Sequence, residues 1–175
     1  AAVRAALPFE LSSEQDVAVN EILDDMARGD RVMNRLLLGD VGTGKTAVAC
    51  CALGAVADSG TQACVMAPTS VLARQYAVKS GPILERAGIS WGLLTGSTPA
   101  DERSVLLDRL RQGEITVLFG THAVLGDDVT FKRLSLVVID EQHRFGVGQR
   151  NTLRAKGPGA DLLVMTRSEE HTSEL

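Results

Sequence analysis

A glycine-rich stretch that follows an apolar run constrains the fold of this chain more than any other feature. Residues 35–46 read Arg-Leu-Leu-Leu-Gly-Asp-Val-Gly-Thr-Gly-Lys-Thr, so four residues separate Gly39 from Gly44-Lys45-Thr46. This is the Walker A spacing of a phosphate-binding loop, which joins a strand to a helix. We therefore predict a strand that ends near Gly39 and a helix that begins near Lys45.

Each part of this loop has a physical task in binding ATP. Small residues let backbone N–H groups point at the phosphates, and the helix adds the positive end of its dipole. Lys45 is expected to reach the β- and γ-phosphates, and the Thr46 hydroxyl to ligate Mg²⁺. The alternative is a glycine-rich turn that binds nothing. The predicted ATP contacts are Gly39, Asp40, Val41, Gly42, Thr43, Gly44, Lys45 and Thr46.

Composition indicates one α/β domain and leaves the partner open. The 175 residues are 45% hydrophobic and only 3% aromatic, which suits buried parallel strands packed against helices. A net charge of −4 lacks the overall basic character of a nucleic-acid binder, so DNA would need a local surface. The three cysteines lack metal-ligand spacing, which predicts buried reduced thiols and a cytoplasmic protein. No signal sequence or membrane-spanning run is recognisable.

The N-terminal region predicts a capped helix. A lead-in segment, residues 1–12, ends in Ser12, and Gln15 follows at the spacing of a capping box. The helical pattern then continues until Gly29. Phe9 and Gln15 also allow a second interpretation, in which the aromatic ring stacks on adenine and the amide reads the edge of the base. The residues themselves favour the cap over this ATP contact.

Strands and helices are expected to alternate along the rest of the chain. Thr98-Pro99 predicts a cap followed by a proline at the first helical position. Gly81-Pro82 should kink or split a helix that continues toward Arg86. The alternation predicts a mostly parallel sheet with helices on both faces and ligands at the carboxyl ends of the strands. The predicted strands cover residues 62–67, 91–94, 115–119, 134–139 and 161–165, and the predicted helices include 47–57, 70–78 and 99–110.

A second motif places two acidic residues directly after an apolar strand. Val137-Val-Ile precedes Asp140-Glu141, which is the Walker B arrangement. Asp140 would join Thr46 in holding Mg²⁺, and Glu141 would orient the water that attacks the γ-phosphate. An isolated Asp-Glu pair is often only a solvated turn. Together the two motifs predict a nucleotide hydrolase whose catalytic residues are Lys45, Asp140 and Glu141.

Five runs carry a resemblance to a known family, and they cover residues 38–46, 66–75, 93–97, 120–123 and 137–150. Within residues 7–166 the chain resembles the superfamily-2 helicases, and among them the first motor domain of the RecG family of bacterial branched-DNA helicases. Asp-Glu-Gln-His at residues 140–143 favours this family. The related transcription-repair coupling factors usually read Asp-Glu-Glu-His at these positions.

The resemblance implies a RecA-like P-loop fold, a three-layer α/β/α domain over residues 13–166. It also implies that Gln142, His143 and Arg144 couple the nucleotide state to neighbouring motifs. Tyr76 stands where the family usually has histidine, so no role is assigned to it. The residues that would meet the DNA backbone are Pro68, Thr69, Thr95, Gly96, Thr121 and His122.

Neutral loop-end residues suit a motor that grips DNA without reading its sequence. Hydroxyl and amide groups can hold phosphates and release them in each cycle, and they are compatible with an acidic net charge. The alternative is that these Thr-Gly and Pro-Thr pairs are ordinary turn and cap residues.

The last nine residues break the resemblance. The family would continue from Met165-Thr166 into Ala-Thr-Pro, whereas residues 167–175 look like translated sequencing adapter, and we expect a truncated gene with a non-native tail.

We predict that this chain is the ATP-binding motor domain of a DNA helicase that remodels forks and recombination intermediates. It would be monomeric and would work with a wedge domain and a second motor domain of the same chain. The alternatives are a double-stranded DNA translocase of the repair-coupling type and a P-loop regulatory switch module.

Overall fold

Parallel strands form the centre of the computed structural model, which describes residues 2–28, 34–38, 43–140 and 147–166. In the sheet they follow the order β1-β6-β5-β2-β4-β3, and every adjacent pair is parallel. The prediction of a mostly parallel sheet is confirmed. The strands are β1 (Asn34–Leu38), β2 (Gln62–Met66), β3 (Trp91–Leu94), β4 (Val117–Gly120), β5 (Leu134–Asp140) and β6 (Asp161–Thr166).

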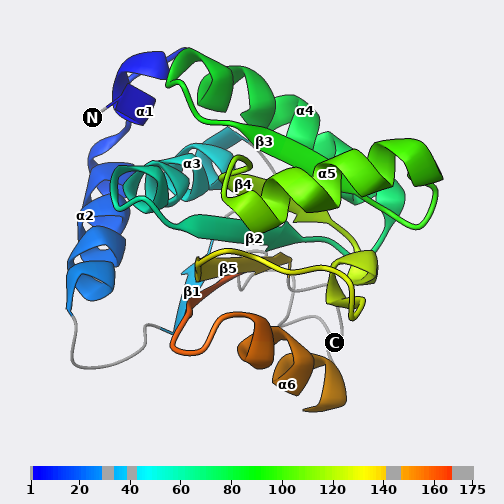
Figure 1. The fold of residues 1–175 in the computed structure, drawn as a ribbon. Helices are drawn as coiled ribbons and strands as arrows, with labels where there is room; N and C mark the ends of the chain where they lie inside the picture. The colour runs from blue at the N-terminus through cyan, green and yellow to red at the C-terminus, as the bar shows by residue number, and fades with distance from the viewer. Residues whose placement is uncertain (1, 29–33, 39–42, 141–146, 167–175) are drawn as a thin grey trace, which may run out of the picture.

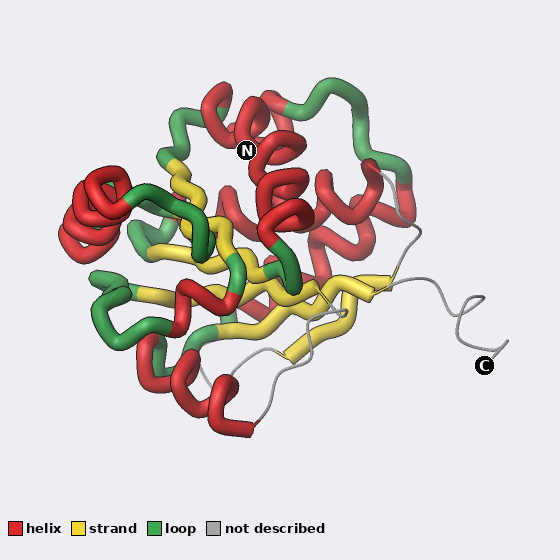
Figure 2. Tube along the Cα trace, turned by 90° about the vertical axis from the view of Figure 1, so that its right-hand side faces the viewer, coloured by secondary structure: helices red, strands yellow, loops and turns green. Residues whose placement is uncertain are grey.

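Helices cover both faces of this sheet, as predicted (Figures 1 and 2). Figure 1 shows α3 and α4 above the sheet and α6 below it. Strand residues alternate between the two sides, because Ala63 and Val65 pack with the first four helices while Cys64 and Met66 pack with α5, η1 and α6. The helices are α1 (Ala2–Ala6), α2 (Ser13–Ala27), α3 (Thr43–Asp58), α4 (Ser70–Arg86), α5 (Ala100–Gln112), the 3₁₀ helix η1 (His122–Leu125) and α6 (Val147–Lys156).

The capping box at the start of α2 is confirmed. The Ser12 Oγ accepts a hydrogen bond from the Gln15 backbone N–H at 3.2 Å, and the Gln15 Oε1 accepts one from the Ser12 N–H at 2.8 Å. Ahead of it, the segment that the sequence suggested only as an apolar lead-in contains α1, which contacts α3 and α4. Val3 and Ala6 of α1 are buried there.

The sequence predicts either a kink or a split at Gly81-Pro82, and the split is wrong, because α4 runs without a break from Ser70 to Arg86. A proline removes one helical hydrogen bond, but buried residues on both sides of it, including Ala77 and Leu84, hold the helix against the sheet. The glycine is needed for packing, since a Cβ at Gly81 would lie 2.8 Å from the ring of Trp91.

The start of α5 is also shifted by one residue from its prediction. Pro99 is the N-cap and makes no side-chain capping bond, so Thr98 is not the cap. The Thr98 Oγ1 instead accepts a hydrogen bond from the Thr95 backbone N–H at 3.0 Å. Its hydroxyl therefore closes the turn that follows β3, a local role that competes with capping.

The three cysteines are buried and unpaired, as predicted. Burial raises the pKa of Cys50 to about 11 and the pKa of Cys64 to about 12. These thiols therefore stay protonated at neutral pH and act as small apolar side chains. Within the described residues, no helix is both long enough and apolar enough to cross a bilayer.

Phe119 on β4 offers a test of the core. Its side chain is only 1% exposed, and its ring meets Trp91 edge to face at a centroid distance of 5.8 Å. Phe119→Ala should lower the free energy of unfolding by about 3–5 kcal/mol, because it removes apolar contacts and leaves a cavity. Urea unfolding can be followed by fluorescence of Trp91, the single tryptophan. Val105→Ala, at a position 61% exposed, is the control. Equal stabilities would contradict this account of the core.

Candidate nucleotide and DNA site

The motifs that follow the strands lie at one edge of the sheet. Because all the strands of the sheet are parallel, their carboxyl ends share that edge. Asp140 is the last residue of β5, and the other motifs follow the carboxyl ends of β1, β2, β3 and β4. Motifs far apart in the sequence thus become neighbours.

Lys45 and Thr46 lie in the first turn of α3, which begins at Thr43. β1 ends at Leu38, so the predicted strand and helix are confirmed, whereas the loop between them lies outside the described residues. Both side chains are partly buried. At this position the backbone N–H groups of the helix have no earlier carbonyl partner within the helix, and the dipole is positive. The local field therefore favours an anion beside Lys45 and Thr46.

Asp140 is separated from the predicted phosphate loop by one strand. β6 lies between β5 and β1, and Met165 of β6 is in register with both Asp140 and Leu37. Two strand spacings are about 10 Å. Asp140 and the carboxyl end of β1 therefore flank the carboxyl end of β6.

Tyr76 of α4 contacts this acidic residue. Its hydroxyl donates a hydrogen bond to the Oδ2 of Asp140, and both side chains are partly buried. Burial raises the pKa of Tyr76, and the hydrogen bond and negative charge of Asp140 raise it further. The phenol therefore stays protonated as a hydrogen-bond donor.

The predicted DNA contacts form a row beside this group. Met66, Gly120 and Leu94 are in register across β2, β4 and β3. The pairs Pro68-Thr69, Thr121-His122 and Thr95-Gly96 follow these strands, whose carboxyl ends lie about 5 Å apart along one edge of the sheet. One residue of each pair is exposed, namely Thr69, His122 and Gly96.

The threonine hydroxyls in this row already have local partners. Thr69 caps α4 by accepting from the Leu72 N–H at 3.2 Å, and Thr121 caps η1 by accepting from the Ala123 N–H at 3.3 Å. Thr95 shares a hydrogen bond of 3.0 Å with Ser97. The interpretation of these residues as caps and turns is confirmed. Contact with DNA stays a prediction, which would use exposed backbone amides and remaining hydroxyl capacity.

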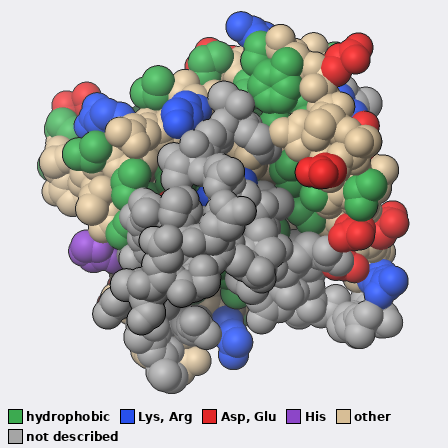
Figure 3. All heavy atoms as spheres, turned by 180° about the vertical axis from the view of Figure 1, so that it is seen from behind, with side chains coloured by type: hydrophobic (Ala, Val, Ile, Leu, Met, Phe, Trp, Pro, Cys, Tyr) green, Lys and Arg blue, Asp and Glu red, His purple; other side chains and the backbone are tan. Residues whose placement is uncertain are grey.

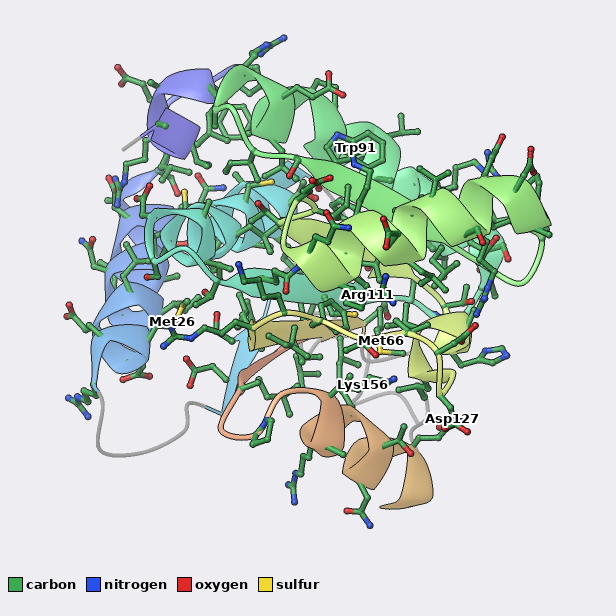
Figure 4. The ribbon with its side chains drawn as sticks, viewed as in Figure 1. Met26, Met66, Trp91, Arg111, Asp127 and Lys156 are labelled. Atoms are coloured by element: carbon green, nitrogen blue, oxygen red, sulfur yellow. The ribbon has the colours of Figure 1, made fainter. Side chains whose placement is uncertain are left out.

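The loop after η1 is held by two side chains from other helices. The Lys156 Nζ reaches from α6 toward this loop (Figure 4) and donates to the carbonyls of Gly126 at 2.7 Å and Val129 at 2.5 Å. Burial lowers the pKa of Lys156, although Asp127 and Asp128 oppose the shift. Arg103 of α5 forms a bidentate ion pair with Asp128, at 2.5 and 2.8 Å. The loop is therefore fixed to both α5 and α6.

A profile of the DEAD/DEAH box helicases matches residues 12–165. The chain belongs to this helicase family.

Among relatives of this helicase chain, the ATP-dependent DNA helicase RecG of Bacillus subtilis (strain 168) is 52% identical over 161 residues. That match covers 92% of this chain and 24% of the relative. RecG of Aquifex aeolicus (strain VF5) is 51% identical over 154 residues, which cover 87% of this chain and 19% of the relative. The chain thus spans about a quarter or less of the curated relatives it matches.

A solved structure confirms the RecA-like fold. Its title is "Structure of RecG bound to three-way DNA junction", and it aligns with a TM-score of 0.81 and 43% sequence identity. The alignment covers 93% of this chain and 22% of the solved chain. The resemblance inferred from the five sequence runs is therefore confirmed.

Several predicted residues of this helicase domain lie outside the described residues. They include Gly39–Gly42, Glu141 and the predicted coupling residues Gln142, His143 and Arg144. Thr43 and Gly44 are described only as backbone in the first turn of α3. The roles of all of these residues stay predictions, as does the separate nature of the 167–175 tail.

The adenine contact also stays a prediction. Phe9 is 38% exposed and lines an open pocket of about 570 Å³ together with Arg4, Pro8 and Asp16. Gln15 uses its side-chain oxygen in the capping box, which leaves its amide group for any contact with a base.

Sequence reasoning missed Tyr76, although a signal was present. Tyr76 falls on the inner side of α4 between Ala73 and Ala77, which are buried. A tyrosine on an apolar helix face usually finds a polar partner for its hydroxyl. The pattern predicts such a partner but cannot identify it as Asp140, because 64 positions separate the two residues.

Proposed function

We propose that this chain is the ATP-binding motor domain of an ATP-dependent DNA helicase that remodels branched DNA. The observation that carries the proposal is the single sheet edge on which Lys45, Thr46 and Asp140 adjoin the row of predicted DNA contacts. A nucleotide and a DNA strand bound at this edge would share the same strands and helices. Binding of the nucleotide could therefore alter the binding of DNA, and binding of DNA could alter the binding of the nucleotide.

The residues present fit Mg²⁺-ATP. A threonine hydroxyl and an aspartate carboxylate are hard oxygen donors of the kind that Mg²⁺ prefers, and Lys45 supplies a positive charge at a helix N-terminus. Thr46 and Asp140 would hold the metal ion, which neutralises charge on the phosphates when bound. Lys45 would bind the β- and γ-phosphates, and Glu141 would orient the attacking water.

Branched DNA is proposed as the partner because of the relatives. Several are named ATP-dependent DNA helicase RecG, and the solved neighbour was bound to a three-way DNA junction. On the face shown in Figure 3, Lys and Arg side chains are scattered among acidic and apolar ones. The proposed grip uses neutral groups, because the pairs Pro68-Thr69, Thr95-Gly96 and Thr121-His122 contain no Lys or Arg. The activity would belong to the bacterial cytoplasm, where the chromosome lies, in repair and recombination.

The helicase activity would need further domains of a longer protein. Since this chain spans about a quarter of its relatives, we propose that a wedge domain and a second motor domain act with it, in one monomeric chain. The second motor domain would close the nucleotide cleft and supply arginines to the transferring phosphoryl group. Such arginines raise the hydrolysis rate by roughly 10³–10⁵ in other nucleotide hydrolases.

We expect the 175-residue chain to bind Mg²⁺-ATP, to hydrolyse it slowly and to separate no strands. Calorimetry with ATP, a steady-state ATPase assay with and without three-way junction DNA, and a strand-separation assay measure these three properties. Fast DNA-stimulated hydrolysis by this chain would contradict the need for a second motor domain. Failure to bind Mg²⁺-ATP would contradict the proposed function.

The protein of full length separates this proposal from its rivals. A branched-DNA helicase should show DNA-stimulated hydrolysis and should unwind a three-way junction. A repair-coupling translocase should displace a third strand from duplex DNA without unwinding the junction. A regulatory switch should bind ATP without any stimulation of hydrolysis by DNA.

A further inference from the structure

We infer that Tyr76 is a positioning residue that holds Asp140 in place for metal binding. Through helix α4, Tyr76 also links Asp140 to the predicted DNA contacts. The inference rests on the proposed function, because it concerns the same nucleotide site. Its basis is the hydrogen bond from the Tyr76 hydroxyl to the Oδ2 of Asp140, which joins α4 to the carboxyl end of β5.

The bond restricts the carboxylate of Asp140. The bond from Tyr76 limits rotation of the carboxylate about its bond to Cβ, so metal binding has less rotation left to restrict. Tyr76 lies on a helix whose inner residues, Ala73 and Ala77, are buried, so the phenol itself is well fixed. Hydrogen-bond partners that orient metal ligands typically change metal affinity by 10–100-fold.

The same helix begins at a predicted DNA contact. Thr69 is the N-cap of α4, and Tyr76 lies about two helical turns farther along, or about 10 Å. Helix α4 is continuous between them and packs on β3 and β4, whose carboxyl ends carry the other contacts in the row. A shift of Thr69 on binding DNA would therefore move the Tyr76 hydroxyl relative to Asp140.

This arrangement has a thermodynamic consequence. If DNA binding alters the position of Tyr76, it must alter the metal affinity of the nucleotide site, and metal binding must alter DNA affinity by the same factor. Tyr76→Phe removes only the hydroxyl, so it should weaken both the metal site and this coupling while leaving the ring in the core.

The experiment compares three forms of the full chain: the natural sequence, Tyr76→Phe and Ser135→Ala. Ser135 is a matched control, because its hydroxyl bonds to Thr61 at 2.6 Å near the opposite end of β5. Binding of Mn²⁺ to each protein in the presence of saturating ATP is measured by electron paramagnetic resonance, with and without three-way junction DNA. Unfolding in urea checks that each variant remains folded.

We expect Tyr76→Phe to weaken Mn²⁺ binding by ten- to a hundredfold and to reduce the effect of DNA on that affinity at least fivefold. ATP binding without metal and the behaviour of Ser135→Ala should match the natural sequence. Mn²⁺ affinity of Tyr76→Phe within twofold of the natural sequence would overturn the positioning role. The link to the DNA contacts would be overturned if DNA changed the Mn²⁺ affinity of Tyr76→Phe as much as that of the natural sequence. It would also be overturned if DNA changed the Mn²⁺ affinity of neither protein. If the natural sequence binds no metal-nucleotide at all, the proposed function fails as well.

Discussion

The affinity for Mg²⁺-ATP is expected to fall tenfold or more in Lys45→Ala, a loss of about 1.4 kcal/mol or above. Lys45 lies in the first turn of α3, where the helix dipole and the backbone N–H groups already favour phosphate. The dipole acts as roughly half a charge, which matches poorly the charge of a triphosphate. The lysine is therefore expected to supply a large part of the attraction.

Calorimetric titration of the purified chain with ATP and Mg²⁺ measures this effect. Lys132→Ala is a suitable control, because Lys132 is an exposed lysine in the segment that leads into the amino end of β5. It changes the net charge equally but lies at the opposite edge of the sheet. Equal losses in both variants would show a general charge effect and would refute the specific role of Lys45.

Hydrolysis of ATP by the full-length protein is expected to fall at least a hundredfold in Glu141→Gln, while ATP affinity stays within a few-fold. The amide keeps the size of the side chain but cannot accept a proton from the attacking water. Binding should survive, since it depends on the phosphate loop and the metal ligands. An effect on hydrolysis without an effect on binding identifies an interaction made in the transition state.

Single-turnover kinetics with prebound ATP separates these two quantities. Glu102→Gln, at an exposed position in the first turn of α5, makes the same chemical change away from the site and is expected to be silent. Survival of hydrolysis within a few-fold in Glu141→Gln would assign the catalytic carboxylate to another residue.

The cap residues show how local structure and the proposed DNA grip can share the same atoms. Thr69 and Thr121 each use the hydroxyl to begin a helix at the end of a strand. At the start of α4 the N–H groups of Ser70 and Val71 have no earlier carbonyl within the helix, so a phosphate could meet them beside Thr69. The confirmed role of Thr69 as a helix cap is therefore compatible with its proposed role in binding DNA.

Much of the fold could be predicted from the sequence, because the relevant signals are local. The Walker A stretch indicates a strand followed by a helix through the spacing of Gly39 and Lys45, and both are present as β1 and α3. The capping box depends only on Ser12 and Gln15, three residues apart, so it needs no tertiary information. Apolar runs located the other five strands to within two residues at each end.

Other predictions failed because distant contacts outweighed local preference. Gly81-Pro82 disfavours a continuous helix, yet α4 continues, since its buried face packs on the sheet and Gly81 accommodates Trp91. Thr98 prefers to cap a helix, yet its hydroxyl is taken by the turn at Thr95. A proline inside a helix costs about 3 kcal/mol relative to alanine and a glycine about 1 kcal/mol, and the burial of several apolar side chains on one helix face can exceed this cost.

Local sequence specifies the strands, the cap of α2 and the chemistry of the nucleotide motifs, because neighbouring residues define these through hydrogen bonds and periodicity. The three-dimensional packing adds that β6 separates β1 from β5, that α5 begins one residue later than its pattern indicates, and that Tyr76 reaches Asp140. Strand order and side-chain partners depend on contacts between residues far apart in the chain. Many arrangements of the same elements satisfy the local pattern, and the packing of the whole core selects one of them.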